Sequence, residues 1–303
     1  MADHTTQAVI LMAYGSPDRL EDVPAYYEDI RGGRPVPQER IDELVERYER
    51  LGIVRARVSP LNAVTEETRA ALQETLEGIP VYTGMKHWRP PIPEAVERAL
   101  AEGATTIAGL VLAPHYSRLS IGDYRRRVEQ AVDGRARLAF VESWHDDPAL
   151  IDFLARRVAP TDRHVVFTAH SLPARILDEG DPYQEQLLET SRLVAQAARL
   201  EDWSFSYQSE SATGEPWLGP DILDHLADLR HRGVTAIRIC PVGFVADHLE
   251  IYWDIDAEAQ ERAEELGLDL DRIEMPNADP AFVAILASLA RTALERTQEP
   301  APA

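Results

Sequence analysis

Acidic side chains recur at every fourth position in one segment of the second half of the chain. Glu250, Asp254 and Glu258 are spaced i, i+4 and i+8, which places three carboxylates along one face of a helix. The segment is too apolar for a helix that stands free in water, because it also contains Ile251 and Trp253. A row of carboxylates on a partly buried helix suits a divalent cation or a proton relay. A solvated helix face is the ordinary alternative for such a charge run, and the spacing alone does not decide between them.

Titratable side chains also follow five apolar runs of the sequence. They are Tyr14, Lys86 with His87, His115, His170, and the group of Asp247, His248 and Glu250. A single histidine at such a place is more often part of a core or a cap. Since ligands of open parallel sheets bind outside the carboxyl ends of the strands, the five together predict one site between two domains. A histidine opposite the carboxylate row would form an imidazole–carboxylate pair that suits Fe²⁺ or Zn²⁺.

Apolar runs that alternate with amphipathic segments predict the elements that must position these side chains. The expected strands are residues 8–15, 80–86, 107–114, 137–143, 164–171, 203–209, 236–244 and 271–277. The expected helices include residues 41–51, 66–76, 183–200, 257–267 and 280–297. This alternation predicts an α/β fold of two doubly wound, Rossmann-like parallel-sheet domains with a cleft between them. We place the domains at residues 1–147, joined by the C-terminal helix 280–297, and at residues 148–279.

The charge balance excludes several classes of partner. The 303 residues include 31 Lys and Arg against 52 Asp and Glu, which gives a net charge of −21. A nucleic-acid binder, or a protein that docks on anionic membranes, needs a basic surface, so neither is expected. The N-terminal segment lacks a basic region, and no run reaches the roughly 18 apolar residues of a membrane span. We therefore expect a soluble cytoplasmic protein, and the acidic surface favours a monomer.

Several catalytic signatures are absent from the sequence. There is no GxxxxGKS/T or GxGxxG pattern, which argues against an ATP-driven enzyme or a nicotinamide dehydrogenase. HExxH, CxxC and GxSxG are absent as well. The single cysteine, Cys240, leaves no intramolecular disulfide and no iron–sulfur cluster held by four cysteines of the chain. We expect no permanently bound cofactor.

Motifs from one end of the chain to the other resemble those of ferrochelatases, which insert Fe²⁺ into a porphyrin in haem biosynthesis. The matching blocks include LMAYGSP (11–17), YYEDIRGGRP (26–35), GMKHW (84–88), AHSLP (169–173), GEPWLGPD (214–221) and GFVADHLE (243–250). The resemblance implies a lyase of two doubly wound domains, with a porphyrin and Fe²⁺ as its substrates.

The subgroup that the chain resembles most is that of the short enzymes of Gram-positive bacteria. The features are YYEDIRGGRP, the absence of a membrane-binding segment and a length near 300 residues. Since those enzymes metallate coproporphyrin III, the resemblance implies that substrate, with Fe-coproporphyrin III (coproheme) as the product. A protoporphyrin IX ferrochelatase and a non-catalytic porphyrin or haem carrier on the same fold are the alternatives.

The resemblance also implies roles for individual residues. His170 and Glu250 match the catalytic pair that meets the metal, and Asp254 and Glu258 extend it as a path for metal or protons.

Other matches concern the porphyrin. Tyr14 matches a tyrosine that can ligate iron from the opposite porphyrin face, and His87 matches an indirect or alternative metal contact. The positions that match contacts to the propionates and the macrocycle edge are Arg31, Arg47, Tyr48, Ser59 and Tyr124.

One segment departs from the family pattern. Where the family reads Gly-Gly-x-Ser-Pro-Leu, this chain reads GIVRARV over residues 52–58 before Ser59. The second glycine is missing and the loop is a few residues longer, which weakens the assignment of Ser59. Arg55 and Arg57 either pair with extra carboxylates of the porphyrin or decorate a surface loop.

Overall fold

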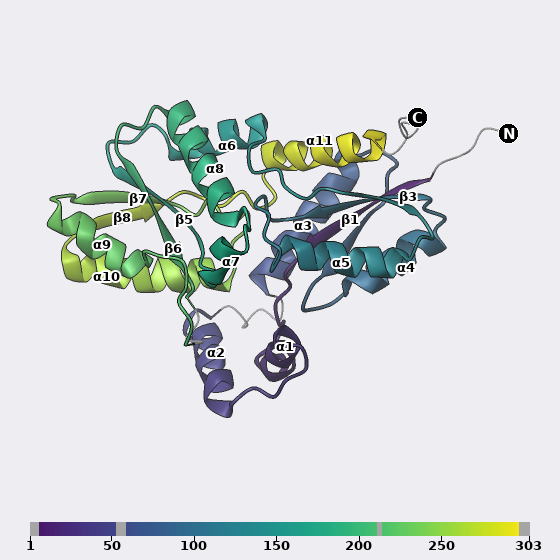
Figure 1. Cartoon of the computed structure of the whole chain (residues 1–303), viewed down its shortest axis with the longest axis horizontal. Coiled ribbons are helices and arrows are strands. Elements are labelled where there is room, and N and C mark those ends of the chain that lie inside the picture. The colour runs from purple at the N-terminus through teal and green to yellow at the C-terminus, as the bar shows by residue number, and fades with distance from the viewer. Residues whose placement is uncertain (1–5, 53–58, 211–213, 297–303) are drawn as a thin grey trace. The chain divides into compact units, whose positions relative to one another are not determined.

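The computed structural model describes residues 6–52, 59–210 and 214–296 (Figure 1). The chain divides into two compact units. Unit 1 comprises Met1–Ala113, Arg118–Glu142 and Asn277–Ala303, and unit 2 comprises Pro114–Ser117 and Ser143–Pro276. The division into domains at residues 1–147 and 148–279, and the cleft expected between them, stay predictions, and each unit is described by itself.

Unit 1 is built on a four-stranded parallel sheet in the order β2-β1-β3-β4. Its strands are β1 (Gln7–Ala13), β2 (Val81–Met85), β3 (Thr106–Val111) and β4 (Arg137–Phe140). Helices α3 (Pro60–Thr75) and α11 (Pro280–Arg296) cover one face, and α4 (Ile92–Ala101) and α5 (Ile121–Val132) cover the other (Figure 1). All residues of β2 and β3 are buried, as expected for a parallel sheet covered on both faces. A short helix η1 (Leu20–Asp22), α1 (Val23–Ile30) and α2 (Gln38–Arg50) follow β1.

Unit 2 repeats this plan with the order β6-β5-β7-β8. Its strands are β5 (His164–His170), β6 (Trp203–Gln208), β7 (Ala236–Cys240) and β8 (Asp269–Arg272). Helices α6 (Pro148–Val158) and α8 (Tyr183–Ala198) lie on one face, and α7 (Arg175–Asp178) is a short helix after β5. The other face carries α9 (Ile222–His231), the π-helix η2 (Ile251–Ala259) and α10 (Gln260–Leu266). The two doubly wound parallel sheets confirm the fold class predicted from the sequence.

Local sequence signals set where several helices begin. Asp147 precedes Pro148 at the start of α6, and its carboxylate accepts hydrogen bonds from the backbone N–H groups of Ala149 and Leu150. Asp221 caps α9 in the same way, through the N–H of Leu223. These caps satisfy N–H groups that have no partner inside the helix.

Some strand boundaries predicted from the sequence are wrong. The last strand is Asp269–Arg272 rather than residues 271–277, because β8 is an edge strand that pairs only with β7, and its register ends at Ile239 opposite Arg272. The strands expected at 8–15 and 236–244 end earlier, at Ala13 and Cys240. The polar residues that follow these strands therefore lie outside the sheets.

The strand order places a switch point in each sheet. In each unit the first strand lies inside the sheet, and the second strand pairs on one side of it. The third strand pairs on the other side, so the strand order changes direction between β1 and β3 and between β5 and β7. The crevice outside the carboxyl ends of such strands is where open α/β sheets bind ligands. His170 ends β5 at this point of unit 2, and Tyr14 follows β1 at the equivalent point of unit 1.

Gly243 allows the loop after β7 to approach the end of β5. A Cβ atom at this position would lie 2.5 Å from the Cβ of Ala169 and 2.9 Å from its Cα. The N–H of Gly243 donates to the carbonyl of Thr168 at 3.1 Å. Only glycine fits so close to the strand, next to His170.

We predict that Gly243→Ala lowers the free energy of unfolding by about 1–3 kcal/mol, because the added methyl group forces the backbone of Ala169 to move. Urea denaturation of the two proteins measures this difference. Gly219→Ala is the matched control, since the nearest atom to a Cβ there is 3.8 Å away. Equal stability of the Gly243→Ala variant and the unsubstituted protein would contradict the expected clash.

Candidate functional site

His170, at the end of β5, turns one ring nitrogen toward Glu250. Its Nδ1 donates a hydrogen bond to the carbonyl of Ser171, which fixes the proton on Nδ1. The other nitrogen, Nε2, lies 3.6 Å from Oε1 of Glu250, too far for a hydrogen bond between them. The side chains are 30% and 37% exposed, so solvent or a ligand reaches both. A neutral imidazole beside a carboxylate can accept a proton or bind a metal ion.

His248 holds Glu250 from the opposite side. Its Nδ1 donates to the carbonyl of Ala246 at 2.9 Å, and its Nε2 donates to Oε2 of Glu250 at 3.3 Å. Although burial lowers the pKa of His248, the hydrogen bond and the charge of Glu250 raise it above the ordinary value. Glu250 is therefore anchored through one oxygen and faces His170 with the other.

The hydroxyl of Tyr183 and the indole of Trp217 complete the surroundings of His170. The Tyr183 hydroxyl, on α8, donates to the carbonyl of His170 at 3.0 Å. The Trp217 ring centroid lies 6.5 Å from that of His170. Trp217 belongs to GEPWLGPD, whose Leu218 bonds the backbone of Leu172 at 2.9 Å. This motif is thus fixed beside the end of β5.

Two residues of the acidic row, Asp254 and Glu258, lie on a π-helix. η2 runs from Ile251 to Ala259, directly after Glu250. π-helices are rare and occur often at functional sites. Asp254 is buried, whereas Glu250 and Glu258 are half-buried. The three carboxylates therefore have different environments.

Asp254 is the buried carboxyl of the site. Its side chain accepts hydrogen bonds from the hydroxyl of Ser209 and, at 3.4 Å, from the amide of Gln208. The amide oxygen of Gln208 in turn accepts a bond from the hydroxyl of Thr168 at 2.9 Å. Burial, followed by the charge of Glu250, raises the pKa of Asp254 to about 6. Such a carboxyl changes protonation state close to neutral pH.

Two nearby acids have a different environment. Asp247 and Asp256 both pair with Arg272, at 2.9 Å and 2.6 Å.

Across the described residues, no group of three or more His, Cys, Asp and Glu side chains has the geometry of a metal site. The metal-binding roles expected of His170, Glu250, Asp254 and Glu258 stay predictions.

Unit 1 carries a second group of predicted residues, around Tyr14. This side chain is 40% exposed, and its ring lies 4.7 Å from the ring of His87. The ammonium of Lys86 lies 5.9 Å from the Tyr14 ring centroid and 5.1 Å from that of Tyr124. Lys86 is buried and pairs with Asp123 at 3.2 Å. An exposed phenol thus stands over a buried cation.

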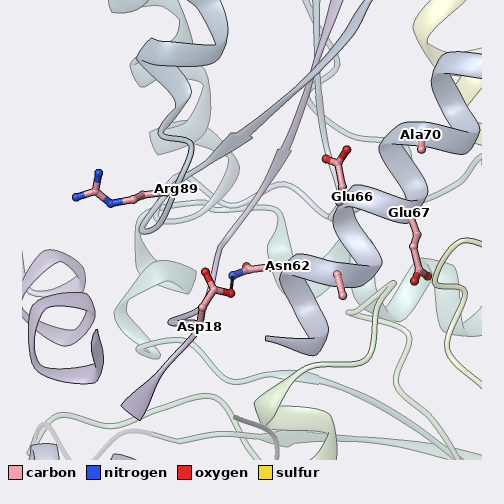
Figure 2. A pocket seen from close by; sticks show the side chains of 7 residues that line it. Asp18, Asn62, Glu66, Glu67, Ala70 and Arg89 are labelled. Carbon is pink, nitrogen blue, oxygen red and sulfur yellow. Dashed lines mark hydrogen bonds between the residues drawn. The ribbon is translucent and has the colours of Figure 1, made fainter. Parts of the chain in front are cut away.

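Asp18 connects three segments beside this group. Its carboxylate accepts hydrogen bonds from the backbone N–H of Ser59 at 3.1 Å, from Asn62 at 2.9 Å and from the indole of Trp88 at 3.0 Å. Figure 2 shows Asp18 and Asn62 joined in this way at an open pocket of about 500 Å³, beside Glu66 on α3. Asp18 thereby fixes the start of α3 next to the loop after β1.

The residues expected to contact the porphyrin differ in exposure. Arg31 and Arg47 are exposed, at the end of α1 and on α2. Tyr48, Ser59 and Tyr124 are buried, and the Tyr48 hydroxyl is 2.8 Å from Oγ of Ser16. Their contact with a porphyrin stays a prediction. Arg55 and Arg57, at residues 53–58, lie outside the described residues.

His115 has a structural environment instead of joining the other strand-end residues. It is 3% exposed, and its Nε2 is bonded to the hydroxyl of Thr190 at 2.9 Å. Burial lowers the pKa of His115 to about 3, so the ring is neutral. Here the core interpretation of a lone histidine is the right one.

Comparison with known proteins decides the family. The family model described as ferrochelatase matches residues 6–294. The chain belongs to the ferrochelatase family. A ferrochelatase of Herpetosiphon aurantiacus is 43% identical over 293 residues, which cover 92% of this chain and 96% of that protein. The reaction of the family is metal insertion into a porphyrin, so the chain is a lyase-type enzyme with porphyrin and iron as substrates.

Relatives named for a specific porphyrin match a similar share of the chain. A coproporphyrin III ferrochelatase of Halalkalibacterium halodurans is 42% identical, covering 93% of this chain and 95% of that one. The protein of that name from Bacillus subtilis is 37% identical, covering 95% and 98%. The solved structure of SirB from Bacillus subtilis with Fe³⁺ has a TM-score of 0.63 at 11% identity and covers 97% of both chains, which supports the shared fold.

Several residues of the site escaped the sequence-based selection. His248 stood among the strand-end residues, but nothing in its position indicated that it would anchor Glu250. In the sequence, Ser209 and Gln208 are 45 and 46 residues away from Asp254, so no local pattern joins them. Only their location at the end of a strand adjacent to β5 could have suggested a contact.

We predict that Asp254→Asn stabilises the protein in a pH-dependent manner. A carboxyl whose folded pKa is raised from 3.8 to about 6 contributes stability below pH 3.8, and this contribution is lost as pH rises through 6. The difference in the free energy of unfolding between variant and unsubstituted protein should therefore grow to about 3 kcal/mol between pH 4 and pH 7. Urea titrations across this range measure it. A difference that stays constant with pH would show that the carboxyl is not perturbed by burial.

Proposed function

We propose that this enzyme inserts Fe²⁺ into coproporphyrin III and yields Fe-coproporphyrin III. The observation that carries the chemistry is that Nε2 of His170 faces Oε1 of Glu250 at 3.6 Å while Nδ1 is bonded to the carbonyl of Ser171. The preference for coproporphyrin III is supported by relatives of that name at 37–42% identity across nearly the whole chain. Exposed Arg31 and Arg47 suit a substrate with four carboxylates.

The proposed reaction exchanges two protons for one metal ion. Two pyrrole N–H bonds must break while hydrated Fe²⁺ loses water and binds the four ring nitrogens. In this proposal His170 accepts protons through Nε2 or meets the metal, and Glu250 holds the ion or proton that His170 passes on. Asp254, with a pKa near 6, and Glu258 carry protons or metal along the π-helix.

The charge pattern supports a basic entrance for this substrate. A chain with a net charge of −21 repels an anionic porphyrin unless cations gather where it enters. In this proposal Arg31 and Arg47 of unit 1 bind propionates, Tyr14 lies against the ring, and unit 2 supplies His170 and Glu250.

Three further expectations belong to the proposal. The enzyme holds no permanent cofactor, and Fe²⁺ is its substrate. It acts as a monomer in the cytoplasm. In the described part of the chain, no helix combines the length and the apolar character needed to cross a membrane.

We predict multiple turnovers with coproporphyrin III and little or none with protoporphyrin IX. Anaerobic Fe²⁺ insertion, followed by the change in porphyrin absorbance with the two rings in parallel, measures both rates. Turnover with protoporphyrin IX alone would overturn the proposed substrate but keep the enzyme class. Tight binding of either ring without turnover would indicate a porphyrin carrier.

We predict that Arg31→Ala and Arg47→Ala each raise KM for coproporphyrin III about fivefold with little change in kcat. The loss of one charge-assisted hydrogen bond at an exposed position corresponds to about 1 kcal/mol. Steady-state kinetics checks this. Arg40→Ala is the matched control on α2, because it also removes an exposed guanidinium but at a position that matches no porphyrin contact of the family. Unchanged KM in both variants would refute the propionate contacts.

A further inference from the structure

His87 has one ring nitrogen bonded to a carboxylate from a distant part of unit 1. Its Nδ1 lies 2.7 Å from Oδ2 of Asp29, on the last turn of α1. The His87 side chain is 7% exposed and that of Asp29 is 54% exposed. Since a carboxylate only accepts hydrogen bonds, Nδ1 carries the ring proton and Nε2 keeps its lone pair.

The ring of His87 lies beside that of Tyr14. In the part of the chain that the structure describes, no hydrogen bond to Nε2 is found, and Nε2 is not among the buried atoms that lack a partner. The ring is tilted by 55° against that of Tyr14, at 4.7 Å between centroids. Tyr14 is one of the few large hydrophobic side chains exposed in the described chain. An acceptor nitrogen is therefore available beside an exposed aromatic face.

An imidazole that donates from Nδ1 to a carboxylate can accept one hydrogen bond through Nε2.

The hydrogen bond between Asp29 and His87 is not the only contact that holds α1 in place. The hydroxyl of Tyr26, on the same helix, donates to the carbonyl of Gly15 at 3.1 Å. The ring of Tyr26 also packs edge-on against Trp88, with centroids 6.0 Å apart. Removal of the Asp29 carboxylate therefore releases the His87 ring while α1 keeps its other attachments.

We propose that Asp29 is a positioning residue for His87, which it holds so that Nε2 accepts a hydrogen bond from a pyrrole N–H of the porphyrin that lies against Tyr14. The proposal rests on the proposed function. Both pyrrole protons must leave during metallation, and an acceptor on the Tyr14 side orients and polarises one of these N–H bonds. Asp29 acts only through His87, as carboxylates that orient functional histidines do in other enzymes.

The test compares four proteins. Asp29→Ala should lower kcat for Fe²⁺ insertion about tenfold and leave KM for the porphyrin within about twofold. Asp29→Asn should retain more activity than the alanine variant, because its amide oxygen can still accept from Nδ1–H. Glu28→Gln, a neighbouring exposed carboxylate on α1, is the control for the loss of charge and should match the unsubstituted protein. An alanine variant with unchanged kcat, or with a loss in KM alone, overturns the proposal.

A second readout does not depend on turnover. Two-dimensional NMR that correlates the ring protons and nitrogens of His87 should show a protonated Nδ1 and a free Nε2 in the unsubstituted protein. In Asp29→Ala we expect that this tautomer is no longer the only one observed. A proton on Nε2 in the unsubstituted protein overturns the positioning role, whatever the activity. If that protein metallates no porphyrin, the proposed function and the pyrrole contact are both wrong, while the spectrum still decides the role of Asp29.

Discussion

The burial of one carboxyl group beside a half-exposed imidazole is the constraint on which the site of unit 2 depends. Asp254 is 6% exposed, so its ionised form is costly unless polar groups surround it. Ser209 and Gln208 supply those groups from the end of β6, whereas the charge of Glu250 opposes ionisation and raises the pKa of Asp254 further. Such a carboxyl exchanges its proton near pH 6.

The topology brings these groups together. His170 ends β5 and Gln208 ends β6, the two strands being paired residue for residue up to these positions. The loop after β7 can reach them because Gly243 permits contact with Ala169. The π-helix then starts directly after Glu250, which His248 holds in place. The site is therefore built from one sheet edge and one loop, and unit 1 repeats the same strand order with Tyr14 after β1.

Much of the fold could be predicted from the sequence, because buried parallel strands appear in it as apolar runs. Polar residues follow each run, at the carboxyl end of the strand. His170 and Glu250 were identified in this way, and the structure places them 3.6 Å apart. The helix type was not predictable, since a spacing of four residues fits an α-helix and leaves a π-helix unsuspected. Contacts such as Asp29 with His87 join residues 58 apart in the chain, and no local pattern indicates them. His115 shows the opposite error, because a buried and a functional histidine follow a strand in the same way.

A crystal structure with metal-free coproporphyrin III bound measures the central claim most directly. The account predicts that the ring nitrogens face Nε2 of His170, with Oε1 of Glu250 beside it. A ring that binds away from His170 and Glu250 would contradict it.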